Sequence, residues 1–133
     1  MKAPSPHLLD FDTLESLYSP RLVAIATHAM TYPESTLEAP WDFPLVKVGG
    51  KILCMLDEVP DGFRFTCKLS SSHTEAMELE GIQPTNHGLG RSGWVTLTVP
   101  HGEAIDVARL HQWIEEAFYL VAPKRVQRLR DSR

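Results

Sequence analysis

Cysteine and long apolar runs are scarce in this chain of 133 residues. Its two cysteines are too few for the disulfide framework of a small secreted domain, which favours a reducing compartment. No apolar run approaches the roughly 20 residues that span a bilayer. The start, MKAPSPHLLDFD, has Pro and Asp where a secretory signal needs an apolar core. We therefore expect a cytoplasmic protein that does not contact a membrane.

Catalytic and metal-binding motifs are also absent. The sequence has no P-loop, no G-x-S-x-G and no H-E-x-x-H. Its histidines are scattered, with no pair four residues apart and no cluster with cysteine. They are His7, His28, His73, His87, His101 and His111. We expect no enzymatic activity, no metal and no cofactor.

One glycine pattern needs a separate argument. Gly88, Gly90 and Gly93 fit G-x-G-x-x-G, the pattern of a dinucleotide site. That site needs a strand before the glycines and a helix after them, so that the helix N-terminus meets the pyrophosphate. Here a helix and a loop are expected before the glycines and a strand after them, so we reject the dinucleotide interpretation.

What is present is a globular composition with an uneven charge. Apolar residues make up 43% and charged residues 23%, which is typical of a folded domain. The formal net charge is −4, yet residues 124–133 hold five basic residues against one acidic residue, so this tail is +4 and the rest is −8. Such a tail indicates a contact with nucleic acid or an acidic partner, or a solubilising helix end. We expect a single domain over residues 1–133, with a loose arm at 1–10 and the basic tail at 124–133.

Capping signals predict four helix starts. At each start, a Ser or Asp precedes a segment whose apolar residues recur with helical spacing. A second signal accompanies it, which is a Glu three residues later, a Pro at the next position, or a hydrophobic staple. The predicted N-cap residues are Asp12, Ser19, Ser72 and Asp106. The helix that begins after Ser72 closes at Gly81. The last helix has an apolar stripe formed by Val107, Leu110, Ile114, Ala117, Phe118 and Val121.

Alternating patterns predict four strands, at residues 43–48, 51–57, 63–69 and 93–99. The element order is therefore α-α-β-β-β-α-β-α. This order indicates an α+β domain of two layers, an antiparallel sheet with helices packed on one face. Residues 82–93 are expected to form a flexible loop.

Strand registers follow from which face is buried. In the second hairpin, Asp57 is expected to face Arg64, and Cys54 to face Cys67. We interpret the two cysteines as small buried apolar residues rather than a disulfide, because a bridge between directly paired neighbours is strained.

The first hairpin is expected to pair Val46 with Cys54 and Val48 with Ile52 through a three-residue loop. A register shifted by one residue would place Lys47 opposite Ile52 inside the core, which disfavours it. Two residues of the second strand, Leu53 and Met55, then fall on the outer face of the sheet. They are either covered there or form a contact patch.

The segment GLGRSGW is the most suggestive one for function. Its glycines allow close approach, Arg91 offers a bidentate donor for phosphate, and Trp94 is able to stack on a base. The alternative is that Trp94 packs under the last helix and Arg91 is merely solvated.

Four segments resemble the MmcQ/YjbR family of small bacterial proteins. They are AMTYPES, PLVKVGGKILCML, GRSGWVTL and LHQWIEEAFYLVAPK, and their order and spacing carry the resemblance over roughly residues 20–126. The resemblance implies a CyaY-like double-wing α+β domain. It also implies DNA binding, a label that rests on fold analogy. The basic positions of the family correspond to Lys51 and Arg91, and its tryptophan to Trp94.

Three hypotheses about function result. The first is a monomeric, non-enzymatic DNA-binding domain whose basic patch comprises Lys47, Lys51, Arg91, Trp94, Lys124, Arg125 and Arg128. The second is a protein-interaction domain that uses the sheet surface around Leu53 and Met55. The third is a small-ligand site at the 82–93 loop, which requires a concave pocket beside Arg91 and His87.

Overall fold

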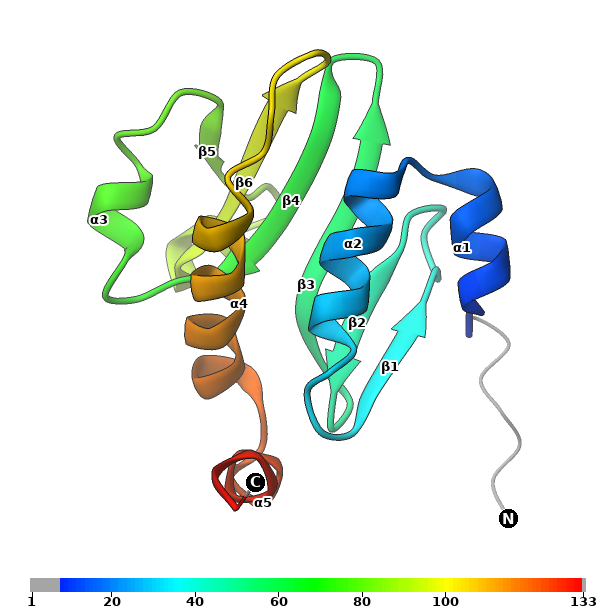
Figure 1. Ribbon diagram of the computed structural model, residues 1–133. Helices are drawn as coiled ribbons and strands as arrows, with labels where there is room; N and C mark the ends of the chain where they lie inside the picture. The colour runs from blue at the N-terminus through cyan, green and yellow to red at the C-terminus, as the bar shows by residue number, and fades with distance from the viewer. Residues whose placement is uncertain (1–7, 133) are drawn as a thin grey trace.

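The computed structural model describes residues 8–132 and shows a six-stranded antiparallel sheet with helices in front of it (Figure 1). The strand order is β1-β2-β3-β4-β6-β5. The strands are β1 (Ser35–Glu38), β2 (Leu45–Val48), β3 (Lys51–Val59), β4 (Gly62–Lys68), β5 (Ile82–Pro84) and β6 (Trp94–Pro100). The helices are α1 (Phe11–Leu17), α2 (Pro20–Ala29), α3 (His73–Ala76), α4 (Val107–Val121) and α5 (Lys124–Asp131), with a 3₁₀ turn η1 (Leu89–Ser92). The predicted α+β class and element order are confirmed, and the short edge strands β1 and β5 are additional.

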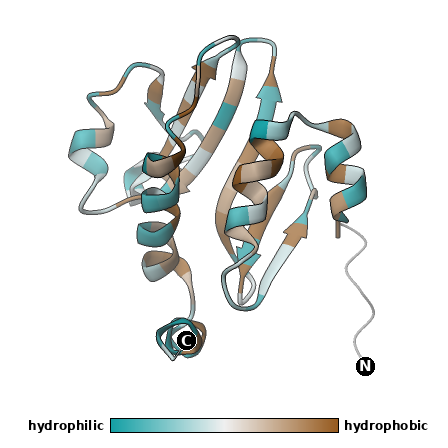
Figure 2. Cartoon of the chain, viewed as in Figure 1, coloured by the Kyte–Doolittle hydropathy of each residue, from teal (hydrophilic) through white to brown (hydrophobic). Residues whose placement is uncertain are grey.

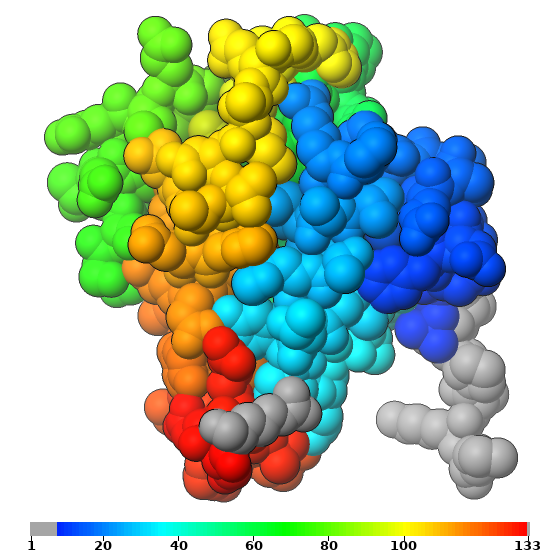
Figure 3. All heavy atoms as spheres, viewed as in Figure 1, coloured from blue at the N-terminus to red at the C-terminus, as the bar shows by residue number. Residues whose placement is uncertain are grey.

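Helices α2 and α4 lie side by side on one face of the sheet, which we call the helix face (Figure 1). Figure 2 shows apolar strand positions behind these helices, and Figure 3 shows the helices and their connections packed over them. The fully buried side chains between the two layers include Leu22, Ile25, Leu56, Phe63, Phe65, Ile114 and Phe118. Burial of this apolar area is the main favourable term in folding.

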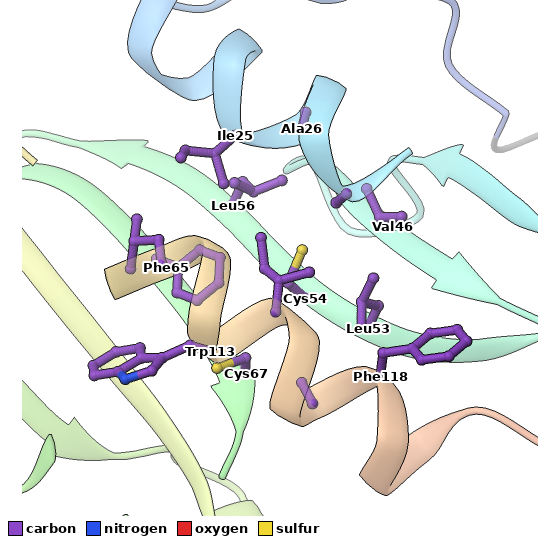
Figure 4. Close-up of a cluster of buried hydrophobic side chains, with 14 of the residues drawn as sticks. Ile25, Ala26, Val46, Leu53, Cys54, Leu56, Phe65, Cys67, Trp113 and Phe118 are labelled. Carbon is purple, nitrogen blue, oxygen red and sulfur yellow. The ribbon is translucent and has the colours of Figure 1, made fainter. Parts of the chain in front are cut away.

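The second hairpin has the predicted register. Asp57 pairs with Arg64, and Cys54 pairs with Cys67. Both cysteines are free and buried on the helix face, where Figure 4 shows them among apolar side chains. Burial raises the pKa of the Cys54 thiol to about 12 and the pKa of Cys67 well above its ordinary value. The interpretation of the cysteines as small buried apolar residues is confirmed.

The register predicted for the first hairpin holds at one end and is wrong at the other. Val46 pairs with Cys54 as expected, but Lys47 pairs with Ile52 and Val48 pairs with Lys51. Leu53 is the extra residue of a β-bulge between these two registers. With the bulge, Val46, Val48, Leu53 and Cys54 are all buried in the core on the helix face, whereas Ile52 lies on the opposite face.

The turn explains why the register changes. Gly49 and Gly50 have φ values of 56° and 84°, which suit a two-residue hairpin turn with positive φ at both central positions. A two-residue turn cannot keep the three-residue register, so β3 absorbs one residue at the bulge. As a result Leu53 is fully buried on the helix face near Phe118 (Figure 4), and its predicted outer position is wrong.

Two helix boundaries differ from the predictions. Helix α1 begins at Phe11, because the Asp10 carboxylate, rather than that of Asp12, accepts a hydrogen bond from the Thr13 backbone N–H at 2.8 Å. Helix α3 has only four residues. Its expected capping residue, Ser72, donates its hydroxyl to Glu116 on α4 at 2.7 Å instead of capping the helix.

The predicted loop at 82–93 contains strand β5 and turn η1. Hydrogen bonds tie it to the sheet: the Thr85 N–H donates to the Trp94 carbonyl, and the Gly90 N–H donates to the Thr85 carbonyl, each at 3.0 Å. The prediction of a loop over this segment therefore missed β5 and η1. At the N-terminus, residues 1–7 of the predicted arm lie outside the described residues. From Leu8 onward the chain joins the fold, because Leu9 N–H donates to the Leu37 carbonyl at 2.9 Å.

Candidate nucleic-acid interface

One end of the sheet brings together cations that are far apart in the sequence. In this antiparallel sheet, β2 and β4 end where β3 and β6 begin. Lys51, Lys68 and the η1 turn with Arg91 therefore lie at the same end, which we call the basic end. Helix α5 is at this end too, since a Cβ added to Gly49 would lie 2.8 Å from Val126 Cγ2. Helix α5 therefore lies next to the turn that precedes β3.

Two of the predicted binding residues at this end are already in ion pairs. Lys47 Nζ lies 3.3 Å from the carboxylate of Glu38. Arg125 donates two hydrogen bonds to the carboxylate of Glu34, and these bonds hold the pKa of that carboxyl below its ordinary value. The exposed Arg125–Glu34 pair contributes little stability, whereas Glu38 of the other pair is buried. In each pair, a phosphate has to displace the carboxylate before it binds the cation.

Five cations at the basic end have no such partner. Within residues 8–132 they form no ion pair or side-chain hydrogen bond, and all except one half-buried lysine are exposed. They are Lys51, Lys68, Arg91, Lys124 and Arg128. Four of these residues were predicted from the sequence. Lys68 was missed, although its place in the alternating strand 63–69 already put it on the solvent side.

The opposite end of the sheet is acidic. Asp57, Glu58 and Asp61 lie at the β3–β4 hairpin, and Glu103 follows β6. Arg21 also reaches this end, because it donates to the backbone carbonyl of Glu103 at 3.1 Å. The acids of this hairpin therefore lie away from the basic end, where Glu34, Glu38 and Glu115 are paired with Arg125, Lys47 and Arg130.

Trp94 lies on the face of the sheet away from α2 and α4, which we call the open face. Along β6 the side chains of Val95, Leu97 and Val99 are buried on the helix face, so Trp94 points the opposite way. Its neighbour across the β4–β6 pairing is Lys68. The alternative in which Trp94 packs under the last helix is thus wrong, and a half-exposed indole stands next to an unpaired lysine.

Gly93 sets the position of this tryptophan. Its φ is 95°, and a Cβ at this residue would lie 2.5 Å from the Leu69 carbonyl oxygen. Only glycine accepts both the conformation and the close approach. The glycine of GRSGW therefore lets β6 begin directly beside the end of β4.

The open face also carries apolar and hydroxyl side chains. Leu45, Ile52 and Met55 are not part of the main core between the layers. Thr96 Oγ1 lies 2.9 Å from Thr66 Oγ1 and 3.1 Å from Thr85 Oγ1, which forms a row of hydrogen-bonded hydroxyls across β4, β6 and the end of β5. Of the predicted contact patch, Met55 is on this face and Leu53 is not.

Hollows in the surface lie elsewhere. One of about 50 Å³ lies between α3 and α4, lined by Ser72, Glu75, Arg109, Gln112 and Trp113 among others. A more open groove between α1 and α2 is lined by Tyr18 and Val23. Neither is lined by Arg91 or His87. Over residues 8–132 there is no group of three or more His, Cys, Asp or Glu side chains that could hold a metal ion. No helix in that range is long and apolar enough to cross a bilayer.

An ordered cluster attaches the basic helix α5 to the body of the protein. The Arg130 guanidinium lies over the Tyr32 ring, 4.4 Å from its centroid, and donates to Glu115 at 2.7 Å. The Tyr32 hydroxyl donates to the same carboxylate. Val126 of α5 is fully buried. The predicted tail is thus a docked helix over residues 124–131, and its cations are held in place relative to the sheet.

Comparison with known families gives one match. The sequence model described as YjbR matches residues 30–120. The match runs from the end of α2 almost to the end of α4, so it contains Lys47, Lys51, Arg91 and Trp94 and stops before α5. No curated protein matches the chain.

Proposed function

The chain belongs to the YjbR family, and from the charges at its basic end we propose that it is a non-enzymatic DNA-binding domain. A single observation carries the proposal. Five cations that have no ion-pair partner within residues 8–132, from four separate segments, lie on elements that meet at one end of the sheet, while the acids of the β3–β4 hairpin lie at the other end. Cations gathered in this way attract phosphates and release their counterions on contact.

The expected binding is weak and depends steeply on salt. With about five phosphate contacts, the association constant falls by about 10²–10³ between 50 and 200 mM salt. The small number of cations predicts a dissociation constant in the range of non-specific binders, about 10⁻⁴–10⁻⁶ M. The two buried thiols suit the reducing cytoplasm, where we place the protein as a monomer.

Fluorescence anisotropy with a labelled DNA duplex of about 20 base pairs tests this proposal. We expect binding at low salt that is lost on raising the salt, and a weaker association for Lys51→Glu and Arg128→Glu. Arg109→Glu is the matched control, since it makes the same charge change at the start of α4, next to Asp106. Absence of binding at about 10 µM protein in low salt, or equal loss in the control, would count against the proposal.

A second candidate is a protein-interaction domain that uses the open face. The supporting observation is that Ile52 and Met55 are half-exposed there and lie outside the main core. A Met55→Glu variant that keeps its DNA affinity but loses a co-purifying protein would favour this candidate.

A further inference from the structure

Within the described range 8–132, the basic end has no projecting element of the kind that reads a DNA groove. A major groove admits an α-helix or a two-stranded ribbon. Helix α5 is instead packed down through Val126 and fixed by the contacts of Arg125 and Arg130. The β2–β3 hairpin has only the two-residue Gly49–Gly50 turn at its tip, and Gly49 lies against α5. The cations are therefore presented on a surface rather than on a projection.

The open face beside these cations has the chemistry of a stacking surface. Trp94 is half-exposed on it, with Lys68 as its cross-strand neighbour. Half-buried Ile52 and Met55 provide apolar surface on β3, which is the neighbour of β4 on the side away from β6. Proteins that bind single strands combine a basic surface with aromatic side chains on which unpaired bases stack. In a duplex the base faces are covered by their neighbours, so Trp94 has nothing to stack on.

We propose that the preferred nucleic acid is a single strand that lies across the open face, with one base stacked on Trp94 and the adjoining phosphate at Lys68. This inference rests on the proposed function and specifies its ligand. Arg91 on η1 lies at the same end of the sheet. Lys51, which is opposite Val48 on the helix-face side, and the cations of α5 contact the strand where it turns around the basic end. The row of threonine hydroxyls on β4 and β6 borders the same path.

The size of the Trp94 contribution can be estimated. Stacking of a base on an aromatic side chain is worth about 1–3 kcal/mol by alanine substitution, which corresponds to about a 5- to 150-fold change in affinity. Trp94→Ala should therefore weaken single-strand binding by that factor. Trp94→Phe keeps an aromatic ring and should retain most of the affinity.

The experiment compares oligothymidine and oligouridine of about 15 nucleotides with a DNA duplex of the same length, by fluorescence anisotropy at low salt. The DNA and RNA strands distinguish the two sources of a single strand. Trp41→Ala is the control, because Trp41 is 58% exposed and follows β1, which is the edge strand farthest from β6 and β5. A thermal melt of each variant confirms that it is folded.

We expect at least about tenfold tighter binding of a single strand than of the duplex. We also expect loss of that preference in Trp94→Ala and in Lys68→Glu, but not in Trp41→Ala. A duplex bound as tightly as the single strands, or a folded Trp94→Ala variant with unchanged affinity for them, overturns this inference and leaves the proposed function standing. No binding of any of the three probes overturns the proposed function itself.

Discussion

The imidazole rings of His28 and His111 are stacked, with their centroids 3.6 Å apart and their planes 8° from parallel. The pair joins α2 to α4 on the outer side of the core. Tyr32 meets the His28 ring edge-on, with the ring centroids 6.0 Å apart. The charges of Arg130 and Glu115 both affect the pKa of His28. Partial burial lowers the pKa of His28, the charges of His111 and Arg130 lower it further, and Glu115 opposes them.

Stability should therefore decrease in mildly acidic solution. Because the folded state binds the His28 proton less readily than the unfolded state does, the contribution of His28 is complete above the unfolded pKa of about 6.5 and is lost as the pH falls. We expect the melting temperature to drop between about pH 7.5 and about pH 5.5. The free energy of unfolding should fall by less than about 1.4 kcal/mol per pH unit, which is the limit for one proton. The carboxyls with lowered pKa values act only at lower pH, since their pKa values lie below 4.5.

A His28→Asn variant should show a flatter dependence of melting temperature on pH in this range. His101→Asn, at an exposed turn after β6, serves as the reference and should keep the wild-type slope. An unchanged slope in His28→Asn would show that the stacked pair does not sense pH.

Glu116 should be important for stability although it is only partly buried. Its carboxylate accepts hydrogen bonds from the Ser70 and Ser72 backbone N–H groups and from the Ser71 and Ser72 hydroxyls, at 2.7–3.1 Å. Burial alone would raise the pKa of Glu116, but these four bonds outweigh it and hold the pKa below its ordinary value. We expect Glu116→Ala to cost about 1–3 kcal/mol in urea unfolding. Glu78→Ala, at an exposed position near α3, should change stability by less than about 0.5 kcal/mol.

The two glycines of the first hairpin form a matched pair for mutation. Both have positive φ, so alanine at either position costs about 1–2 kcal/mol in backbone strain. A Cβ at Gly50 meets nothing within 4 Å, whereas a Cβ at Gly49 lies 2.8 Å from Val126 Cγ2. Gly49→Ala should therefore be less stable than Gly50→Ala by a further 1–3 kcal/mol or so. Equal losses in the free energy of unfolding, measured by chemical denaturation, would mean that α5 shifts at little cost to make room for the added Cβ.

The thiols of the two cysteines should be unreactive in the folded protein. Burial raises the pKa of both thiols, so almost no thiolate is present at neutral pH. We expect no reaction with a thiol-specific disulfide reagent under native conditions and reaction of both cysteines in denaturant. Rapid modification of the native protein would show that the sheet opens around Cys54 and Cys67.

Local patterns in the sequence determined a large part of the fold. The alternation in β4 and β6 was predicted correctly, because each of these strands has one buried face. The direction of Trp94 was left open, since the sequence did not show which element covers each face. The bulge at Leu53 was missed because it is a compromise between the Gly49–Gly50 turn and the burial of Val46 with Cys54. No single segment contains both requirements.

The candidate site was harder to predict, since its properties depend on contacts between distant segments. From the sequence, Lys47 and Arg125 were predicted to be free to bind phosphate. In the fold, Glu38 and Glu34 lie beside them and form ion pairs with them. Arg130, by contrast, serves as an anchor only because α5 docks against Tyr32 and Glu115. Ser72 shows the same limit in a helix, because its capping signal is overridden by Glu116, 44 residues away.

The separation of charge along the strands makes this small molecule an electric dipole, with its positive pole at the basic end and its negative pole at the β3–β4 hairpin. A dipole in the field of a polyanion feels a torque before any atom touches. In the proposed binding, the protein would therefore turn its positive pole toward the strand before contact, and a larger fraction of collisions would be productive than the overall negative charge suggests.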